Sequence, residues 1–352
     1  MTLFLTLKPF LQMSIKFTKY PSIDRATRKK TVEAIKLAGH HRKLWYAENK
    51  IHGSNLSVIA TANEVAFAKR SGLLGDDNFY GLHALTPKLQ DMARTVFEHC
   101  NTVFDGIEQV ILRGEIFGGT YPHDDVPRNP SATRVQKEVF YSPNNEFYVF
   151  DIQVDGQYMS CDAKYDLCCD LGIPHCRPLA MGTLNELLEE LNPVFDDPIS
   201  TELGYPKIKD NKSEGYVLKP NEACYLSCGS RVILKLKNPK FSEQKSGKSK
   251  TQPAPAKDYS PEVRVAIEEV DRYITENRLR NVLSKLGSEF TNKDFGKIMG
   301  AFNKDVLADF EADSIGFAKL SKEDKKVVTK QMSNRSSQLL REHFVNIIDG
   351  EF

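Results

Sequence analysis

Residues 48–55 read "ENKIHGSN" and place a lysine and a histidine two positions apart, followed by a glycine. Alternate side chains of a strand share a face, so Lys50 and His52 are expected to point one way while Ile51 packs into the core. Gly53 would then end the strand and allow the backbone a close approach to another group. A lysine inside an apolar run needs a compensating partner, and the chemistry of the protein depends on what that partner is.

Two further strand-like segments present cations in the same manner. In "VILKLKN", Lys235 and Lys237 alternate with leucines, and "SEGYVLKP" runs from Glu214 at its start to Lys219 near its end. Lysines gathered on one face repel one another unless a polyanion lies between them. These strands therefore predict a site for a nucleoside triphosphate.

Beside a triphosphate, Lys50 would be a nucleophile toward phosphorus. Only the free amine can attack, and neighbouring cations and a divalent metal favour the free amine over the ammonium. Each pattern is weak when taken singly, because K-x-H-G occurs by chance and lysines alternating with aliphatic residues usually form a solvated strand face. The order and combination of the segments carry the prediction.

Composition sets limits on the class of protein. The chain has 352 residues, 40% of them hydrophobic and 27% charged, which indicates about two globular domains. The net charge of +1 excludes a polycation, so any affinity for nucleic acid must come from local patches. No apolar run is long enough to cross a bilayer, and we expect a cytoplasmic protein, with an organelle as the alternative.

The seven cysteines include no CxxC pair and indicate reduced thiols. A zinc site is not favoured, because the spacing of its candidate ligands matches no usual zinc pattern. These candidates are Cys168, Cys169, His175 and Cys176.

The chain divides into four parts by composition. We expect an N-terminal extension over 1–16 (with Met13 as an alternative start), a domain over 17–241, a polar linker over 242–261, and a helical domain over 262–352. The second part predicts an α+β fold of antiparallel sheets flanked by helices, without a repeating βαβ pattern. The last part predicts a small all-helical domain.

Several elements of these domains follow from local patterns. Hairpins are predicted around Ala62-Asn63 in "LSVIATANEVAFAKR" and around Asp155-Gly156 in "EFYVFDIQVDGQYMS". Helices are predicted for "TPKLQDMARTVFEHCNTV" and "LNELLEELN". Beyond the linker, three amphipathic helical stretches are "EVRVAIEEVDRYITENRLRNVLSKLG", "NKDFGKIMGAFNKDVLADFEA" and "SKEDKKVVTKQMSNRSSQLLREHFVNIID".

Taken in order, six segments give the chain a resemblance to the covalent nucleotidyltransferase superfamily of ATP-dependent ligases and capping enzymes. They are "ENKIHGSN", "AFAKRSG", "LRGEIFGG", "FYVFDI", "EGYVLKP" and "ILKLKN". Within that superfamily the chain resembles the RNA ligase 2 family, which includes phage enzymes and the trypanosome RNA-editing ligases. The likeness extends from Lys19 to the C-terminal helices.

The resemblance implies an ATP-dependent RNA ligase that seals 3′-hydroxyl and 5′-phosphate ends, preferably at nicks in duplex RNA. Lys50 would attack the α-phosphate of ATP, with Mg²⁺ or Mn²⁺, to give lysyl-AMP and pyrophosphate. The AMP would pass to the 5′-phosphate of an RNA end, and the 3′-hydroxyl would then displace AMP. The part 17–241 would be the adenylyltransferase domain, the partner would be RNA, and we expect a monomer.

The resemblance also implies roles for individual residues. Glu115 would accept a hydrogen bond from the ribose, Phe150 would stack on adenine, and Glu214 would help to hold the metal. The catalytic set is Lys50, His52 and Asp151. The ATP or AMP set is Asn49, Lys50, Glu115, Phe150, Lys235 and Lys237. The residues expected at the RNA break are Asn55, Arg70, Tyr20, Lys219 and Arg231.

Some features depart from the phage pattern. Glu48 stands where the phage enzymes carry an arginine, which reverses a charge near the site. The long segment from "GGTYPH" to "YSPN" is more similar to the editing ligases, whereas the C-terminal part is more similar to the phage enzymes. The lysine-rich stretch up to Lys250, followed by Arg278, Arg280 and Lys285, predicts a phosphate-binding surface with salt-sensitive affinity for RNA.

Three alternatives remain open at this point. A DNA ligase and a capping guanylyltransferase usually carry aspartate where this chain has His52, and no OB-fold pattern follows "ILKLKN". A nucleic-acid-binding protein without catalysis is supported only by Glu48.

Overall fold

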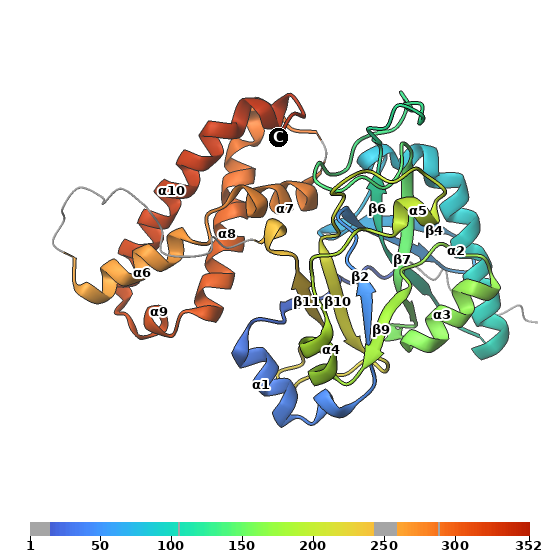
Figure 1. Ribbon diagram of the computed structural model, residues 1–352, viewed down its shortest axis with the longest axis horizontal. Coiled ribbons are helices and arrows are strands. Elements are labelled where there is room, and N and C mark those ends of the chain that lie inside the picture. The colour runs from blue at the N-terminus through green and yellow to red at the C-terminus, as the bar shows by residue number, and fades with distance from the viewer. Residues whose placement is uncertain (1–14, 105, 243–258, 288) are drawn as a thin grey trace, which may run out of the picture.

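The computed structural model describes residues 15–104, 106–242, 259–287 and 289–352, and it has two parts (Figure 1). The strands all lie between residues 24 and 237, where they form two sheets. The residues from 261 onward form helices. The predicted α+β class, with a helical C-terminal part, is confirmed.

The first sheet has five strands in the order β1-β11-β10-β2-β9. Its strands are β1 (Asp24–Arg25), β11 (Leu234–Lys237), β10 (Gly215–Pro220), β2 (Trp45–Asn49) and β9 (Pro178–Gly182). The strand β10 pairs antiparallel with β11 and with β2, and it brings Val217 level with both Lys235 and Glu48. Side chains of α1 (Lys29–Leu37) and α4 (Leu184–Glu190) share a hydrophobic cluster with this sheet.

The second sheet has six strands in the order β5-β4-β3-β6-β7-β8. They are β5 (Gly72–Leu73), β4 (Val65–Lys69), β3 (Ser54–Ala60), β6 (Val110–Gly118), β7 (Asn145–Val154) and β8 (Gln157–Tyr158). The long helix α2 (Leu82–Phe104) covers one face and buries Leu89 and Val96 against Leu56 and Leu112. The short helices α3 (Cys161–Asp170) and α5 (Ile199–Glu202) lie in the connections after β8 and β9.

Both predicted hairpins are confirmed, because β3 pairs with β4 and β7 pairs with β8. At the second turn, Asp155 and Gly156 have φ values of 48° and 82°, the left-handed pair that a tight hairpin turn needs. The two predicted helices correspond to α2, between the hairpins in the chain, and α4, after the second hairpin.

The C-terminal helices are α6 (Pro261–Asp271), α7 (Glu276–Leu286), α8 (Phe295–Asp313), α9 (Ile315–Lys319) and α10 (Lys322–Ile348). They share one apolar core, in which Phe302 and Phe310 of α8 are fully buried. The first predicted stretch is wrong as a single helix: it divides into α6 and α7, because the Thr275 side chain accepts a hydrogen bond from the Arg278 N–H and starts a new helix. The other two stretches match α8 and α10.

The helical part docks on the sheets through ion pairs at one end of α8. Asp313 accepts hydrogen bonds from Arg25 and from Arg28 Nε, the latter at 2.7 Å. At the other side, the Ser54 hydroxyl donates to the carbonyl of Ser284 on α7 at 2.7 Å. The start of β3 is therefore in direct contact with α7.

The predicted domain boundaries stay predictions. Most of the expected linker 242–261 and of the extension 1–16 falls outside the described residues. Among the described helices, none combines the length and the apolarity that a bilayer span requires.

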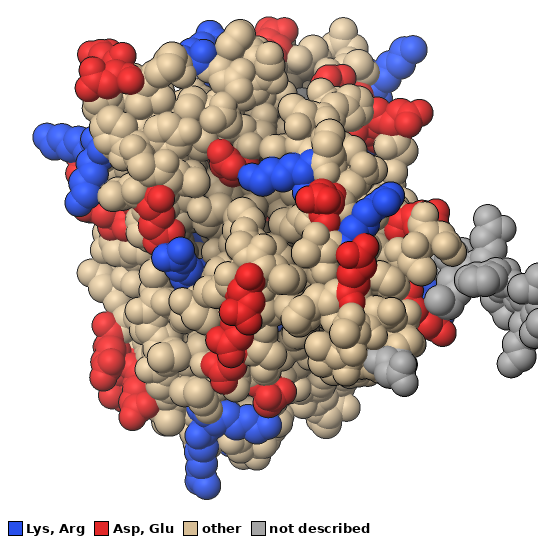
Figure 2. Space-filling view, turned by 90° about the vertical axis from the view of Figure 1, so that its right-hand side faces the viewer, with Lys and Arg blue, Asp and Glu red and all other residues tan. Residues whose placement is uncertain are grey.

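The face on the α2 side, to the right in Figure 1, carries mixed charge. Lysines and arginines alternate there with acidic residues (Figure 2). Among the residues coloured in that view, the basic side chains do not gather into one area, so this face offers little for a polyanion.

Candidate active site

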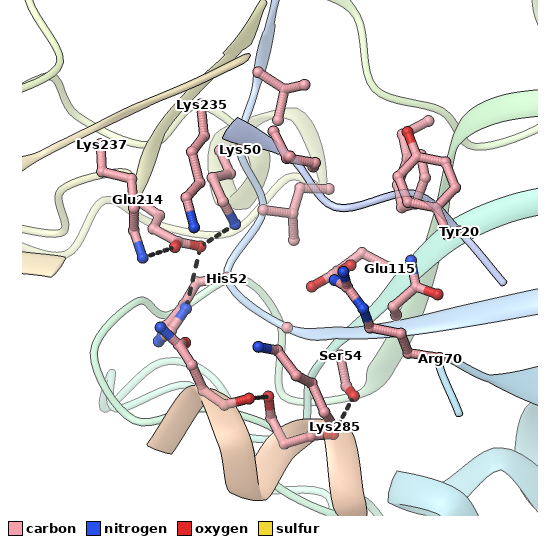
Figure 3. Close-up of a pocket in the computed structure, with 18 of the residues that line it drawn as sticks. Tyr20, Lys50, His52, Ser54, Arg70, Glu115, Glu214, Lys235, Lys237 and Lys285 are labelled. Atoms are coloured by element: carbon pink, nitrogen blue, oxygen red, sulfur yellow. Dashed lines mark hydrogen bonds and ion pairs between the residues drawn. The ribbon is translucent and has the colours of Figure 1, made fainter. Parts of the chain in front are cut away.

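A cavity of about 230 Å³ lies between the two sheets, and α7 closes one side of it (Figure 3). Its walls come from the segment between β2 and β3, from β6, β7, β10 and β11, and from the α7 face that carries Ser284 and Lys285. The site therefore combines segments far apart in the chain, including the helical part.

The chain crosses from the first sheet to the second at residues 50–53. The prediction that Lys50 and His52 lie on a strand is wrong, because β2 ends at Asn49 and β3 begins at Ser54. The Lys50 N–H still donates to the Gly215 carbonyl at 2.8 Å, so pairing with the β10 segment persists for one residue beyond β2. The backbone then leaves the first sheet in order to join β6 of the second.

Gly53 makes the predicted close approach, and its neighbour is the protein itself. A methyl group at this position would lie 2.3 Å from the Ile116 carbonyl oxygen and 2.8 Å from Cγ of Glu115. Only glycine fits here, and this packing fixes where His52 and Ser54 emerge.

Glu214 is the anion at the centre of the site. Its Oε2 accepts from Lys50 Nζ at 2.7 Å and lies 3.3 Å from His52 Nδ1, while its Oε1 lies 2.8 Å from Lys237 Nζ. Burial would raise the pKa of this carboxyl, but the charges of Lys237, Lys50 and His52 hold it well below its usual value. Glu214, directly before β10, thus stays ionised among three cations.

The lysines of β11 point to the same place, as predicted. Leu234 is fully buried behind the strand, whereas Lys235 and Lys237 reach the cavity beside Lys50 (Figure 3). A carboxylate at the centre of this lysine group occupies the position where a polyanion was expected. The cluster is therefore suited to exchanging a protein carboxylate for ligand phosphates.

The opposite wall is formed by β6, β7 and the β4 end. Glu115, Phe150, Tyr20, Asn55 and Arg70 all line the cavity there. Burial raises the pKa of Glu115 to about 7, although Lys50 opposes this. The Phe150 ring lies 5.1 Å from the Tyr20 ring at an edge-on angle of 65°, which leaves an aromatic face at the wall.

Asn49 is held rigidly at the end of β2. Its side-chain Nδ2 donates to Asp197 Oδ2 at 2.9 Å, and its side-chain Oδ1 accepts from the Ser213 hydroxyl at 2.5 Å. Burial raises the pKa of Asp197 to about 6. Asn49 lines the cavity, so the predicted ligand contact has a side chain whose orientation is already fixed.

Asp151 and Arg231 are not brought to the cavity. Asp151 is 4% exposed and accepts from Arg231 at 2.6 Å, from Lys219 at 2.9 Å and from the Tyr20 hydroxyl at 2.5 Å. These cations hold the pKa of Asp151 far below its usual value, against the effect of its burial. Asp151 and Arg231 lie behind the wall, while Tyr20 and Lys219 line it as well.

Glu48 is also neutralised within the protein. It is 2% exposed, and its two oxygens contact Lys164 Nζ at 2.6 Å and Lys219 Nζ at 2.9 Å. The charge reversal that the sequence suggested is therefore compensated by a lysine on α3 that no motif predicted.

The basic side chains of α7 pair with carboxylates of the protein. Arg278 is fully buried and contacts Asp305 at 2.6 Å and Asp309 at 3.0 Å, so its prediction as part of an exposed phosphate-binding surface is wrong. Lys285 contacts Asp305 at 3.0 Å and lines the cavity. The amphipathic pattern of α7 predicted the helix. It did not predict the carboxylates on α8 that pair with Arg278 and Lys285.

Glu138 is a residue of the site that the sequence patterns missed. It comes from the long segment between β6 and β7 and lies 2.9 Å from His52 Nε2. No periodicity or motif marks it, since its segment forms no helix or strand.

A lysine held by a carboxylate among further lysines, beside an aromatic wall, has the charge and shape that suit a phosphorylated nucleotide. Comparison with known families agrees. The family model described as RNA ligase matches residues 43–237, more than half of the chain, and the model described as T4 RNA ligase 2 C-terminal matches residues 257–338. The chain belongs to the RNA ligase family and is an enzyme of that class.

Two curated relatives have a similar extent. RNA-editing ligase 2, mitochondrial, of Trypanosoma brucei brucei is 27% identical over 354 residues, which cover 85% of this chain and 84% of the relative. RNA-editing ligase 1, mitochondrial, of the same organism is 26% identical and covers 85% of this chain and 77% of its own length.

Solved structures of Naegleria gruberi RNA ligase were also matched. A mutant with ATP and Mn is 16% identical, covers 63% of this chain and 58% of that chain, and has a TM-score of 0.41. The form with PPi is 16% identical, covers 66% of this chain and 61% of that chain, and has a TM-score of 0.40.

Proposed function

We propose that the protein is an ATP-dependent RNA ligase that seals 3′-hydroxyl and 5′-phosphate ends, preferably at nicks in duplex RNA, through lysyl-AMP on Lys50. The observation that carries this proposal is the position of Lys50 Nζ, 2.7 Å from Glu214 and beside Lys235 and Lys237 in the cavity. Membership of the RNA ligase family supports it.

In the first step, the Lys50 amine attacks the α-phosphorus of ATP. A nitrogen–phosphorus bond forms, the bond to the bridging oxygen breaks, and pyrophosphate leaves with the electron pair. An ammonium paired to a carboxylate is no nucleophile, so the contact between Lys50 and Glu214 must loosen first. Incoming phosphates provide a reason, since they compete with Glu214 for Lys235 and Lys237.

Among the described residues, no three His, Cys, Asp or Glu side chains form a metal-binding group, so a divalent metal would be held by Glu214 together with the substrate phosphates. Mg²⁺ binds commonly through one or two carboxylates together with substrate phosphates, and Glu214 offers an ionised carboxylate at the phosphate end of the cavity. A metal bound there would supply positive charge to the phosphates and weaken the hold of Glu214 on Lys50.

The other wall would bind the nucleoside and the RNA end. Glu115 is protonated up to a pH of about 7 and can donate a hydrogen bond to a ribose hydroxyl below that pH or accept one above it. Phe150 offers its ring to adenine. Asn55 and Arg70 remain for the 5′-phosphate of the RNA end. An oxygen of that phosphate would attack the phosphorus of lysyl-AMP, and the nitrogen–phosphorus bond would break to free the Lys50 amine. The 3′-hydroxyl would then attack the 5′-phosphate, and AMP would leave with the electron pair of the bond that breaks.

Asp151 would act from behind the wall. Through Lys219 it fixes one end of β10, and through the Tyr20 hydroxyl it fixes the aromatic edge. We therefore assign Asp151 and Arg231 a positioning role in this proposal.

The test is sealing of a nicked duplex by the full chain with Mg²⁺. We expect RNA strands with a 5′-phosphate to be joined with ATP and not with GTP, and a single-stranded RNA to be joined more slowly. Sealing of DNA alone, or transfer of GMP to a 5′-diphosphate end, would replace the proposal by a DNA ligase or a capping enzyme. Lys50→Ala is the inactive control, and Lys36→Ala on the exposed side of α1 is the matched active control.

A further inference from the structure

The helical part closes the side of the cavity where the proposed function places the RNA end. Asn55 and Arg70 line this side together with three residues of α7, which are Asn281, Ser284 and Lys285 (Figure 3). Pockets for small ligands commonly measure about 300–1,000 Å³, whereas this cavity measures about 230 Å³. It is too small for a nucleotide and an RNA strand together, so the helical part must move before RNA reaches the site.

Carboxylates of α8 also lie where RNA phosphates are expected. Asp305 and Asp309, one helical turn apart, line the cavity. Lys285, the α7 cation that lines it too, is already paired with Asp305 at 3.0 Å. An approaching RNA phosphate would meet two carboxylates and a cation whose charge is compensated within the protein. Docked α8 therefore opposes RNA by its charge as well as by its volume.

The contacts that dock the helical part are ion pairs and hydrogen bonds. Among the described residues, the hydrophobic clusters of the sheets end at Phe241 and that of the helices begins at Tyr259, so no cluster joins the two parts. Carbonyls at the C-terminal end of α7 accept hydrogen bonds from Ser54, Lys69 and Tyr80. Polar interfaces between domains of one chain usually permit relative motion.

Arg25 and Arg28 are at the centre of the ionic contact. Asp313 accepts from both, with Arg28 Nε at 2.7 Å, and Asp309 lies 3.4 Å from Arg28 Nη2. Among the described residues, the buried Nε of Arg25 has no hydrogen-bond partner, so Asp313 does not satisfy this guanidinium fully. Arg28 also contacts Asp24 of its own part at 2.6 Å. Because a guanidinium fork fits phosphate as well as carboxylate, a phosphate can take the place of Asp313.

These arginines lie beside the cavity. Ser22 and Ile23 line it, and Arg25 pairs in register with Lys235 of β11, which lines it as well. A duplex with its nick at the cavity extends past it on both sides, since one common double-stranded RNA domain alone contacts about 16 base pairs. Phosphates next to the nick are therefore within reach of Arg25 and Arg28 once α8 has left.

We propose that Arg25 and Arg28 form a binding site for backbone phosphates of duplex RNA, and that Asp309 and Asp313 of α8 occupy this site in the free protein. Binding of the duplex and docking of α8 then exclude each other, and RNA phosphates displace the two carboxylates. The proposal deepens the proposed function and rests on it, because it names the surface that holds the duplex beside the nick.

The test is the affinity of the full chain for a nicked duplex RNA, measured by fluorescence anisotropy without ATP. Asp313→Asn removes a competitor of the RNA and should tighten binding about tenfold, because the apparent affinity rises with the fraction of protein in the binding-competent state. The matched control is Glu311→Gln, which removes the same charge from an exposed position of α8 and should change the affinity by less than about twofold. In the double variant Arg25→Gln/Arg28→Gln, adding Asp313→Asn should change nothing.

A second measurement follows the helical part itself. In neutron scattering with the RNA contrast-matched, the radius of gyration of the native protein should increase when the duplex binds. This measurement needs only the native chain, so it decides the question if the arginine double variant does not fold.

The proposal is overturned by an unchanged radius in the complex, by equal affinities of Asp313→Asn and Glu311→Gln, or by a gain from Asp313→Asn that persists without the two arginines. Absence of RNA binding would overturn it as well. Neither measurement uses ATP or depends on Lys50, so the results are independent of whether lysyl-AMP forms.

Discussion

Replacing Glu48 by glutamine should destabilise the protein strongly, even though the change is isosteric. In Glu48→Gln, Lys219 Nζ would retain its hydrogen bonds to Asp151 at 2.9 Å and to the Phe150 carbonyl at 2.6 Å. Lys164 is 2% exposed, and among the described residues the one hydrogen bond that it would retain is to the Cys176 carbonyl at 3.2 Å. Removing one partner of a buried ion pair costs about 3–5 kcal/mol. We expect about 3 kcal/mol, the low end, because the amide oxygen still accepts a hydrogen bond from Lys164.

The assay is urea unfolding, followed by a signal from the sheet domain. The double variant Glu48→Gln/Lys164→Met should recover most of the lost stability, since it leaves no uncompensated charge. Glu48→Arg should be worse than Glu48→Gln, because it places a third cation beside two lysines. A loss below about 1 kcal/mol for Glu48→Gln, or additive losses in the double variant, would refute the reasoning.

Three further outcomes are expected. Between a pH of about 4.5 and about 7, the free energy of unfolding of the native chain should fall by about 3 kcal/mol relative to Glu115→Gln. Burial raises the folded pKa of Glu115 to about 7, so its stabilisation is complete below the unfolded pKa and is lost as the pH rises through 7. The same pH dependence of urea unfolding in both proteins would contradict this. Asp313→Asn should weaken the docking of the helical part by about 2 kcal/mol, because Arg25 and Arg28 lose the carboxylate that they share. An unchanged radius of gyration from X-ray scattering, together with unchanged amide hydrogen exchange in α1, would argue against it. Gly53→Ala should cost more than about 3 kcal/mol, since its methyl would lie 2.3 Å from the Ile116 carbonyl oxygen. The control is Gly75→Ala, where an added methyl would have nothing within 4 Å, and a thermal melt of Gly53→Ala like that of Gly75→Ala would show that the approach is not tight.

Much of the fold could be predicted because its signals are local. The Asp155-Gly156 turn, the alternation of Lys235 and Lys237 with leucines, and the periodicity of α2 all depend on a few neighbouring residues. The break between α6 and α7 was missed, since Thr275 acts as a cap only once its tertiary surroundings end the first helix.

The residue at which a strand ends within a motif was harder to predict than the motif itself. "ENKIHGSN" was expected to be a strand through His52, but the chain changes sheets after Asn49. Which sheet a residue joins depends on partners far along the sequence, here β10 and β6, and local propensity does not specify them.

The partners of buried charges were the least predictable part of the site. Lys164 for Glu48, Glu138 for His52 and the α8 carboxylates for Arg278 all come from segments without a motif. Which charges pair depends on which side chains the fold brings together. From the sequence alone, several other carboxylates or lysines were equally good candidates.

The central claim is that Lys50 takes AMP from ATP. The measurement that tests it most directly is label transfer: the full chain is mixed with Mg²⁺ and ATP labelled at the α-phosphate, denatured, and analysed for bound label beside Lys50→Ala and Lys36→Ala. The account predicts label on the native chain and on Lys36→Ala, located by peptide mapping at Lys50, and none on Lys50→Ala. Absence of label from folded native protein whose intact mass shows no AMP already bound, or label that persists in Lys50→Ala, would contradict it.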